Sequence, residues 1–184
     1  MHVGCEVSSS DIAAIAAHAA FGRPLITNVH RGLIAEAIVS KALGEEWSWR
    51  SADYAGWDFE RADGVRLEVK QAASRQSWHG ADDQPSRISF DVRERKGRYE
   101  GAAWVPGNQR WADVYVFAHH YVADASADHR NASQWAFYVV AARELPNQLT
   151  IALSRVRGLA AACSQAGLSE ELNRVLACSP ARSG

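Results

Sequence analysis

Alternating apolar and polar residues between positions 57 and 70 predict two short antiparallel strands. The side chains at every second position are expected on one apolar face of the pair: Trp57, Phe59, Val65, Leu67 and Val69. Between the strands, Ala62-Asp63-Gly64 has the composition of a three-residue hairpin loop, in which Gly64 takes the positive φ. The pattern therefore predicts a β-hairpin with one apolar and one polar face.

Helical and strand patterns continue along the rest of the chain. Helices are expected at about 11–21 (after the cap cluster Ser8-Ser9-Ser10), 29–43 and 170–177. Further strands are expected at 87–93, 112–122 and 134–142, with a short edge strand at 149–153 and a Gly- and Pro-containing connection at 96–110. This order predicts an α/β (α+β) fold in which helices flank a mixed central sheet.

The composition indicates one globular domain over residues 1–184, with 47% hydrophobic residues to form a core. We expect an N-terminal helical extension at 1–27, a core at 28–158, and a C-terminal helix and tail at 159–184. No apolar run reaches the roughly 20 residues that a membrane span needs, and the first residues lack the basic start of a signal peptide. The three cysteines contain no CxxC, so we expect reduced thiols in a cytoplasmic protein.

The polar face of the hairpin places two carboxylates opposite each other. If Arg61 pairs with Val65, counting outward brings Asp58 opposite Glu68, with Cβ atoms only about 5 Å apart. A bound cation would remove their repulsion, and Lys70 lies on the same face two residues beyond Glu68. An alternative is a solvent-facing strand pair held by cross-strand ion pairs. Asp followed by Glu-x-Lys on adjacent strands is an arrangement that can hold a divalent metal against a phosphodiester.

Glu36 is the only charged residue on an otherwise apolar arc of the helix predicted at 29–43. An unpaired buried carboxylate costs several kcal/mol or takes up a proton. A helix beside the hairpin would bring Glu36 near Asp58 and Glu68, where a cation would compensate all three. The alternative is a glutamate at the helix rim, paired with an arginine such as Arg66.

These residue types suit Mg²⁺, with Mn²⁺ as a substitute, because hard oxygen ligands hold it together with water and a substrate phosphate. The Val69 carbonyl lies between the two side chains and is a natural further ligand. A bound metal lowers the pKa of an attacking water and neutralises charge on the phosphorane. Lys70 would orient that water, help to deprotonate it or stabilise the transition state, and the sequence does not decide among these roles.

Glu36, Trp57-Asp58 and Glu68-Val69-Lys70 together resemble the restriction-endonuclease-like D…(D/E)xK nuclease superfamily. More narrowly, four blocks are similar to a group of mostly uncharacterised bacterial proteins within it: EVKQAASRQSW at 68–78, ISF at 88–90, ADVYVFA at 112–118 and QWAFYVV at 134–140. The resemblance covers residues 28–158. It implies an αβββαβ core, with Glu36, Asp58 and Glu68 as metal ligands and Lys70 as a catalytic residue. Trp57 stands where the superfamily motif has Pro.

The resemblance also implies DNA, or RNA, as the partner, and a homodimer is one way to supply specificity. The net charge of −1 does not indicate a nucleic-acid binder, but six basic residues lie between Arg87 and Arg110. An ordinary solvated hairpin explains these charges equally well. The candidate contact residues are Arg31, Gln71, Arg75, Gln76, Trp78, Arg93, Arg95 and Lys96. Gln71 fits a structural role equally well, and Trp78 is expected in the core rather than stacked on a base.

The sequence leaves three functions open. The first is a Mg²⁺-dependent endonuclease that hydrolyses DNA in restriction, defence or repair. The second is a nucleic-acid-binding or interaction module that keeps the fold without turnover. The third is an RNA-directed nuclease.

Overall fold

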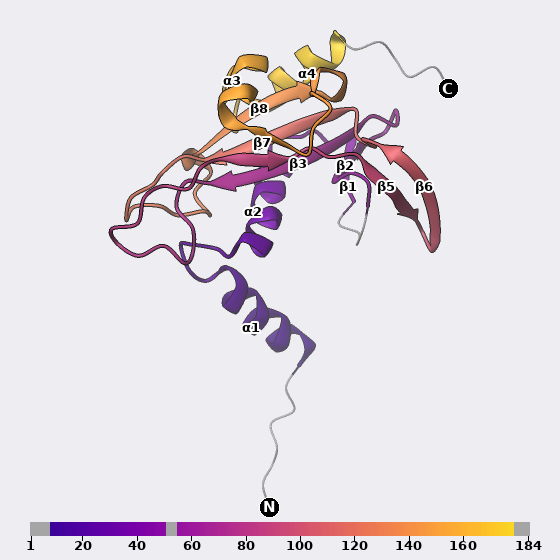
Figure 1. The fold of residues 1–184 in the computed structure, drawn as a ribbon. Coiled ribbons are helices and arrows are strands. Elements are labelled where there is room, and N and C mark those ends of the chain that lie inside the picture. Colours follow the sequence, from indigo (N-terminus) through magenta and orange to yellow (C-terminus); the bar gives the residue numbers. More distant parts are fainter. Residues whose placement is uncertain (1–7, 51–54, 179–184) are drawn as a thin grey trace, which may run out of the picture.

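The computed structural model describes residues 8–50 and 55–178. Its centre is a five-stranded sheet in the order β1-β2-β3-β7-β8 (Figure 1). The strands are β1 (Trp47–Trp49), β2 (Phe59–Arg61), β3 (Arg66–Ala73), β7 (Val114–His120) and β8 (Trp135–Ala141). Since β3 and β7 run parallel and all other neighbours run antiparallel, the sheet is mixed, as predicted.

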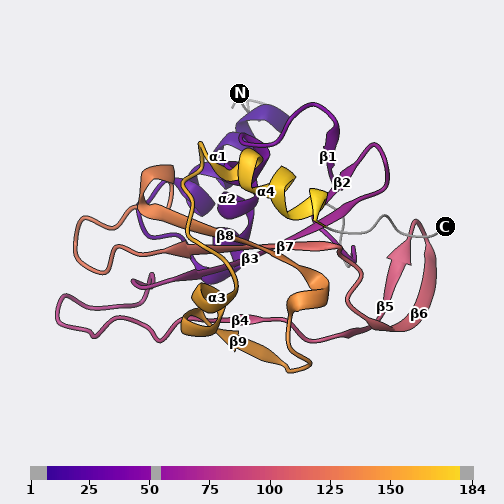
Figure 2. The same cartoon turned by 90° about the horizontal axis from the view of Figure 1, so that it is seen from above.

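Helices and a second pair of strands cover the two faces of this sheet (Figure 2). The helices that do so are α2 (Asn28–Ser40), α3 (Leu153–Leu159) and α4 (Leu168–Ala177), whereas α1 (Ser9–Phe21) has no buried residue and extends away from the sheet (Figure 1). Two 3-10 turns, η1 (Ala132–Gln134) and η2 (Ala142–Glu144), complete the elements of the described residues. One core cluster joins α2 and α4 to the sheet. The other joins α3 and the two-stranded sheet of β4 (Ser89–Asp91) and β9 (Thr150–Ala152) to the opposite face. The predicted mixed α+β class is confirmed.

The strand β7 shows why its sequence is a nearly continuous apolar run. All seven of its residues are buried. Val114 and Val116 belong to the cluster beneath α2 and α4, whereas Tyr115 and Phe117 belong to the cluster beneath β4 and β9. A strand covered on both faces needs apolar side chains at both alternations, which removes the usual period of two.

The β2–β3 hairpin follows the prediction at its turn. The Arg61 amide donates to the Val65 carbonyl at 2.8 Å, and Gly64 has a φ of 86°. At its open end the alternation breaks, because the Asp58 amide donates to the Leu67 carbonyl at 2.9 Å, before the regular ladder begins at Phe59. Trp57 therefore packs near the β4–β9 cluster and Phe59 in the other, so the prediction that they share a face is wrong.

Two corrections concern the segment between β3 and β7. Residues 96–110 were expected to be a connection, but they contribute to a β-hairpin of β5 (Arg95–Glu100) and β6 (Ala103–Gln109), which projects from the body (Figures 1 and 2). Gly97 interrupts the strand pattern in the sequence. In the structure a Cβ atom at this position would lie 2.3 Å from the Trp104 ring, so only glycine fits. The strand expected at 87–93 is only three residues long and pairs with β9 outside the central sheet.

Stacked arginine and tryptophan side chains fix the base of the β5–β6 hairpin. The Arg66 guanidinium lies 3.8 Å from the centre of the Trp57 ring, and the Arg98 guanidinium lies 5.1 Å from the same centre. Arg98 also lies 4.3 Å from the Trp111 ring. Each cation–π contact contributes about 0.5–2 kcal/mol. The stack joins β5 to the β2–β3 hairpin and so positions the first residue of β5, Arg95.

Three histidines near the end of β7 are buried as neutral side chains. The exposed fractions of His119, His120 and His129 are 5%, 0% and 0%. His129 accepts a hydrogen bond from the Ile26 amide at Nδ1 (2.9 Å), and its Nε2 lies 3.0 Å from the Arg75 carbonyl, to which it donates. Burial lowers the pKa of His119 and of His129 to about 4.

No helix within residues 8–50 and 55–178 is long and apolar enough to cross a membrane.

The buried His119, His120 and His129 predict that the folded state loses stability in acid. Because their folded-state pKa lies below the unfolded value of about 6.5, their contribution to stability is complete above pH 6.5 and is lost as the pH falls towards 4. The substitution His129→Asn should lower the free energy of unfolding by about 1–3 kcal/mol at neutral pH, and by much less near pH 5. Urea titrations at both pH values measure this. The exposed His18→Asn is the control, and an equal loss at both pH values would contradict the prediction.

Candidate metal and phosphodiester site

Four predicted site residues meet beside the β2–β3 hairpin, although they come from three segments. Asp58 immediately precedes β2, Glu68 and Lys70 alternate along β3, and Glu36 belongs to α2. The charges of Glu36, Glu68 and Lys70 all act on the Asp58 carboxyl group. The structure thus places these four residues within electrostatic reach of one another.

The Asp58 carboxyl group lies in surroundings that disfavour its charge. Burial, followed by repulsion from Glu68 and Glu36, raises its pKa to about 8. A hydrogen bond of 2.6 Å from the Val69 amide to Asp58 Oδ2 opposes this shift and orients the carboxyl group beside the Val69 peptide. At neutral pH Asp58 is therefore largely protonated without a further cation.

Glu36 lies at the rim of the same group. Burial raises its pKa, and the Glu68 charge raises it further. The Trp49 indole donates to Glu36 Oε2 at 2.9 Å, which opposes the rise. The arginine partner that the sequence offered as an alternative, Arg66, instead stacks on Trp57. Glu36 therefore faces the other carboxylates without a guanidinium of its own among the ion pairs of the described residues.

Glu68 is the best compensated of the three carboxylates. Its side chain is almost fully buried, and Oε1 accepts hydrogen bonds from Lys70 Nζ and, at 3.0 Å, from Arg95 Nη2. Tyr115 lies beside Glu68 in the parallel register of β3 and β7. Burial and the Glu68 charge raise the pKa of the Tyr115 hydroxyl, so it remains a hydrogen-bond donor at all ordinary pH values.

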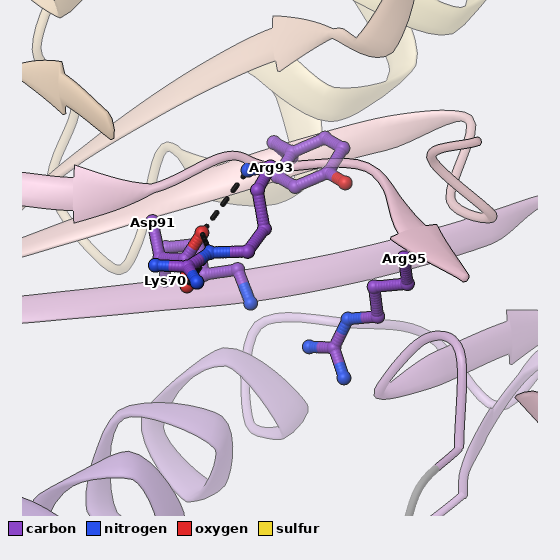
Figure 3. A pocket seen from close by; sticks show the side chains of 5 residues that line it. Lys70, Asp91, Arg93 and Arg95 are labelled. Atoms are coloured by element: carbon purple, nitrogen blue, oxygen red, sulfur yellow. Dashed lines mark hydrogen bonds and ion pairs between the residues drawn. The ribbon is translucent and has the colours of Figure 1, made fainter. Parts of the chain in front are cut away.

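A pocket of about 250 Å³ is lined by Lys70, Asp91, Arg93, Arg95 and Tyr115 (Figure 3). It lies next to Glu68, because Lys70 and Arg95 pair with that carboxylate. Arg93 pairs with Asp91 at 2.9 Å, and three of the five lining residues are cationic. Asp91 and Tyr115 were missed by the sequence analysis, because only their positions on β4 and β7 place them at the pocket. Its charge suits a phosphate group.

The oxygen donors around Asp58 are of the type that binds a divalent metal. Within the described residues, no group of three or more His, Cys, Asp or Glu side chains is assembled for a metal ion. The carboxyl groups of Asp58 and Glu36 are nevertheless hard oxygen donors, and their raised pKa values show that burial and mutual repulsion disfavour their charged form. A cation beside these two groups would favour their charged form, whereas the charge of Glu68 is already offset by Lys70 and Arg95.

Three of the candidate nucleic-acid contacts bond with one another inside the protein. Arg31 is 1% exposed. Its guanidinium donates to Gln71 Oε1 at 2.6 Å, to Gln76 Oε1 at 2.9 Å and to Asn28 Oδ1 at 2.8 Å. Burial without a carboxylate partner among these contacts lowers the Arg31 pKa to about 10. This cluster ties α2 to β3, so the structural role weighed for Gln71 is the one that the geometry supports.

The other candidates are nearer the surface. Trp78 is 67% exposed, so its expected place in the core is wrong: the polar segment after β3 offers no apolar layer to cover it. Arg75 donates to the carbonyls of Ala123 and Gly80, at 3.2 and 3.1 Å. Arg93, Arg95 and Lys96 are exposed. Arg93 and Arg95 line the pocket beside Glu68, whereas Lys96, which follows Arg95 on β5, does not.

Comparisons of the chain with protein-family models, curated proteins and solved structures give no match.

The raised pKa of Asp58 predicts that Asp58→Asn stabilises the metal-free protein. Because the folded-state pKa exceeds the unfolded value, wild-type stability falls as the pH rises from about 4 to about 8. The free energy of unfolding of the variant should exceed that of wild type by on the order of 1–3 kcal/mol at pH 8, and this difference should disappear near pH 4. Millimolar Mg²⁺ should raise the Tm of wild type but not of the variant. Thermal melts measure both effects.

The exposed Asp82→Asn is the control for removing a negative charge. A variant that is less stable than wild type at pH 8 without metal would contradict the electrostatic assignment of Asp58.

Proposed function

We propose that this chain is a Mg²⁺-dependent endonuclease that hydrolyses DNA phosphodiester bonds on a restriction-endonuclease-like core. The observation that carries the proposal is the group of Asp58, Glu68 and Lys70, which lies next to a cationic pocket and is approached by Glu36 from α2. Carboxylates that repel one another beside lysine and arginine side chains are the arrangement that metal-assisted phosphoryl chemistry requires.

The order of elements gives partial support to the proposed core. A helix, α2, precedes the three antiparallel strands β1, β2 and β3, and β7 then joins β3 in parallel. The αβββαβ order would place a helix between β3 and β7. In this chain residues 74–113 contain the strands β4, β5 and β6 instead. This crossover departs from the αβββαβ order but leaves in place the strands that carry the candidate site residues.

Asp58 and Glu68 would hold the metal, with Glu36 and the Val69 carbonyl as further oxygen ligands. When bound, Mg²⁺, or Mn²⁺ in its place, supplies a water of lowered pKa and neutralises charge on the phosphate. The Val69 amide keeps Asp58 oriented towards this position. Lys70 is within reach of Glu68 and can donate to charge that develops on a phosphate oxygen. Arg93 and Arg95 hold the phosphodiester by charge-assisted hydrogen bonds from the pocket.

One observation favours a second function, a nucleic-acid-binding module without turnover. Glu68 already has two basic partners, Lys70 and Arg95, which satisfy its charge without a metal. In that reading the pocket binds a phosphate and the carboxylates only position the basic side chains. An RNA-directed nuclease would use the same site. In either function a homodimer would be one way to supply specificity.

The test is cleavage of plasmid DNA, linear DNA and RNA with Mg²⁺ or Mn²⁺ by wild type, Asp58→Ala and Lys70→Ala. Both substitutions should lower the cleavage rate by about 10²-fold or more, because each removes a group that stabilises the transition state. Lys41→Ala, which removes an exposed lysine at the end of α2, is the matched control and should cleave like wild type.

Cleavage that survives in both variants would refute the site assignment. If wild type binds DNA but cleaves neither DNA nor RNA with either metal, the binding-module function replaces the nuclease.

A further inference from the structure

A second pocket lies on the outer face of the β4–β9 sheet, away from Glu68. Its volume is about 660 Å³, and residues from β4, β9 and α3 line it, including Arg87, Ser89, Gln148, Thr150 and Arg155. Alternation explains the polar lining: Phe90 and Ile151 point into the core, so their strand neighbours Ser89 and Thr150 face outward and are exposed.

The charge of this pocket is unbalanced. Two of its lining residues, Arg87 and Arg155, are basic, and none of the described lining residues is acidic. Other arginines have carboxylate partners: Arg61 pairs with Asp63, Arg130 with Asp128 and Arg174 with Glu171. Among the ion pairs of residues 8–50 and 55–178, neither Arg87 nor Arg155 takes part. Both guanidinium groups are exposed and available to an anion.

The surrounding groups fit a phosphate in particular. The Ser89 and Thr150 side chains provide hydroxyl donors at the wall between the two arginines. Guanidinium and hydroxyl donors are the groups that proteins use most on phosphate oxygens, and arginine can bind them in a bidentate manner. The Gln148 side chain donates to the Thr150 carbonyl at 2.6 Å, which holds the segment before β9 in place.

The strand β4 connects this pocket to the one beside Glu68. Ser89 lines the outer pocket, and Asp91, two residues on and on the same face, lines the other together with Arg93. At about 3.3 Å per residue, Arg87 and Arg93 lie within about 20 Å of each other, which is about six base-pair steps of 3.4 Å. Figure 2 shows β4 flanked by β9 and α3 and continuing towards the β5–β6 hairpin. A single duplex backbone can therefore reach both pockets.

We propose that the pocket between Arg87 and Arg155 binds a backbone phosphate of DNA at a position remote from the scissile bond. This inference rests on the proposed function for the identity of the ligand, but it concerns binding rather than cleavage. The pocket sets where the duplex lies relative to Lys70, with Arg87 and Arg155 as positioning residues.

The test measures the affinity for a short DNA duplex by fluorescence anisotropy without divalent metal, over a series of salt concentrations. The double substitution Arg87→Gln and Arg155→Gln should weaken binding about 10-fold or more at moderate salt. It should also reduce the slope of log K against log salt by about 0.9, because one phosphate is no longer neutralised. The double control Arg23→Gln and Lys41→Gln removes the same charge from exposed positions near the ends of α1 and α2, and should leave the slope unchanged.

An unchanged slope in the double variant would overturn the inference, and so would a wild-type protein that does not bind the duplex. Inorganic phosphate provides a second arm. If the double substitution abolishes phosphate binding but leaves the DNA slope unaltered, the pocket takes a free anion and the DNA assignment falls. A wild-type protein that fails to cleave, yet shows the predicted change in slope, supports this inference while the nuclease proposal fails.

Discussion

The parallel pairing of β3 with β7 is the constraint on which the rest of this structure depends. It joins Leu67 to Val114 and continues in register to Ala73 and His120. A parallel pair cannot be closed by a tight turn, so the chain must travel over the sheet between the two strands. Here residues 74–113 make that passage and carry β4, β5 and β6. The pairing therefore places Tyr115 beside Glu68 and brings the cationic side chains of the crossover above them.

The electrostatics of the site have one balanced and one unbalanced part. Around Glu68, two basic side chains offset the cost of burying a carboxylate. Around Asp58 and Glu36 burial raises the pKa and cations contribute less, so the carboxyl groups retain their protons to higher pH. The site therefore places two carboxyl groups that a nearby cation would ionise next to a cationic pocket lined by Lys70, Arg93 and Arg95.

Local patterns predicted the elements whose sequence and structure agree over a few residues. The helix α1 begins at the expected cap cluster, where Ser8 is the N-cap, and Gly64 closes the β2–β3 turn as expected. The β5–β6 hairpin was not predicted, because Gly97 is needed to make room for the overlying Trp104 ring and not to form a turn. Contacts between residues far apart in the sequence also explain an incorrect expectation at the site. Arginine commonly contacts phosphate, but Arg31 is bonded inside the protein to Gln71 and Gln76, which lie 40 and 45 residues away in the sequence.

By itself the sequence determined that Asp58, Glu68 and Lys70 share one hairpin, because alternation and loop composition act between close neighbours along the chain. It also predicted the strands at 112–122 and 134–142, which the structure shows as β7 and β8. Only the tertiary structure decided that Arg95 pairs with Glu68 and that Arg87 and Arg155 face one pocket. These side chains lie 27 and 68 residues apart. Their meeting depends on the path of the crossover and on the β4–β9 pairing, which no local pattern encodes.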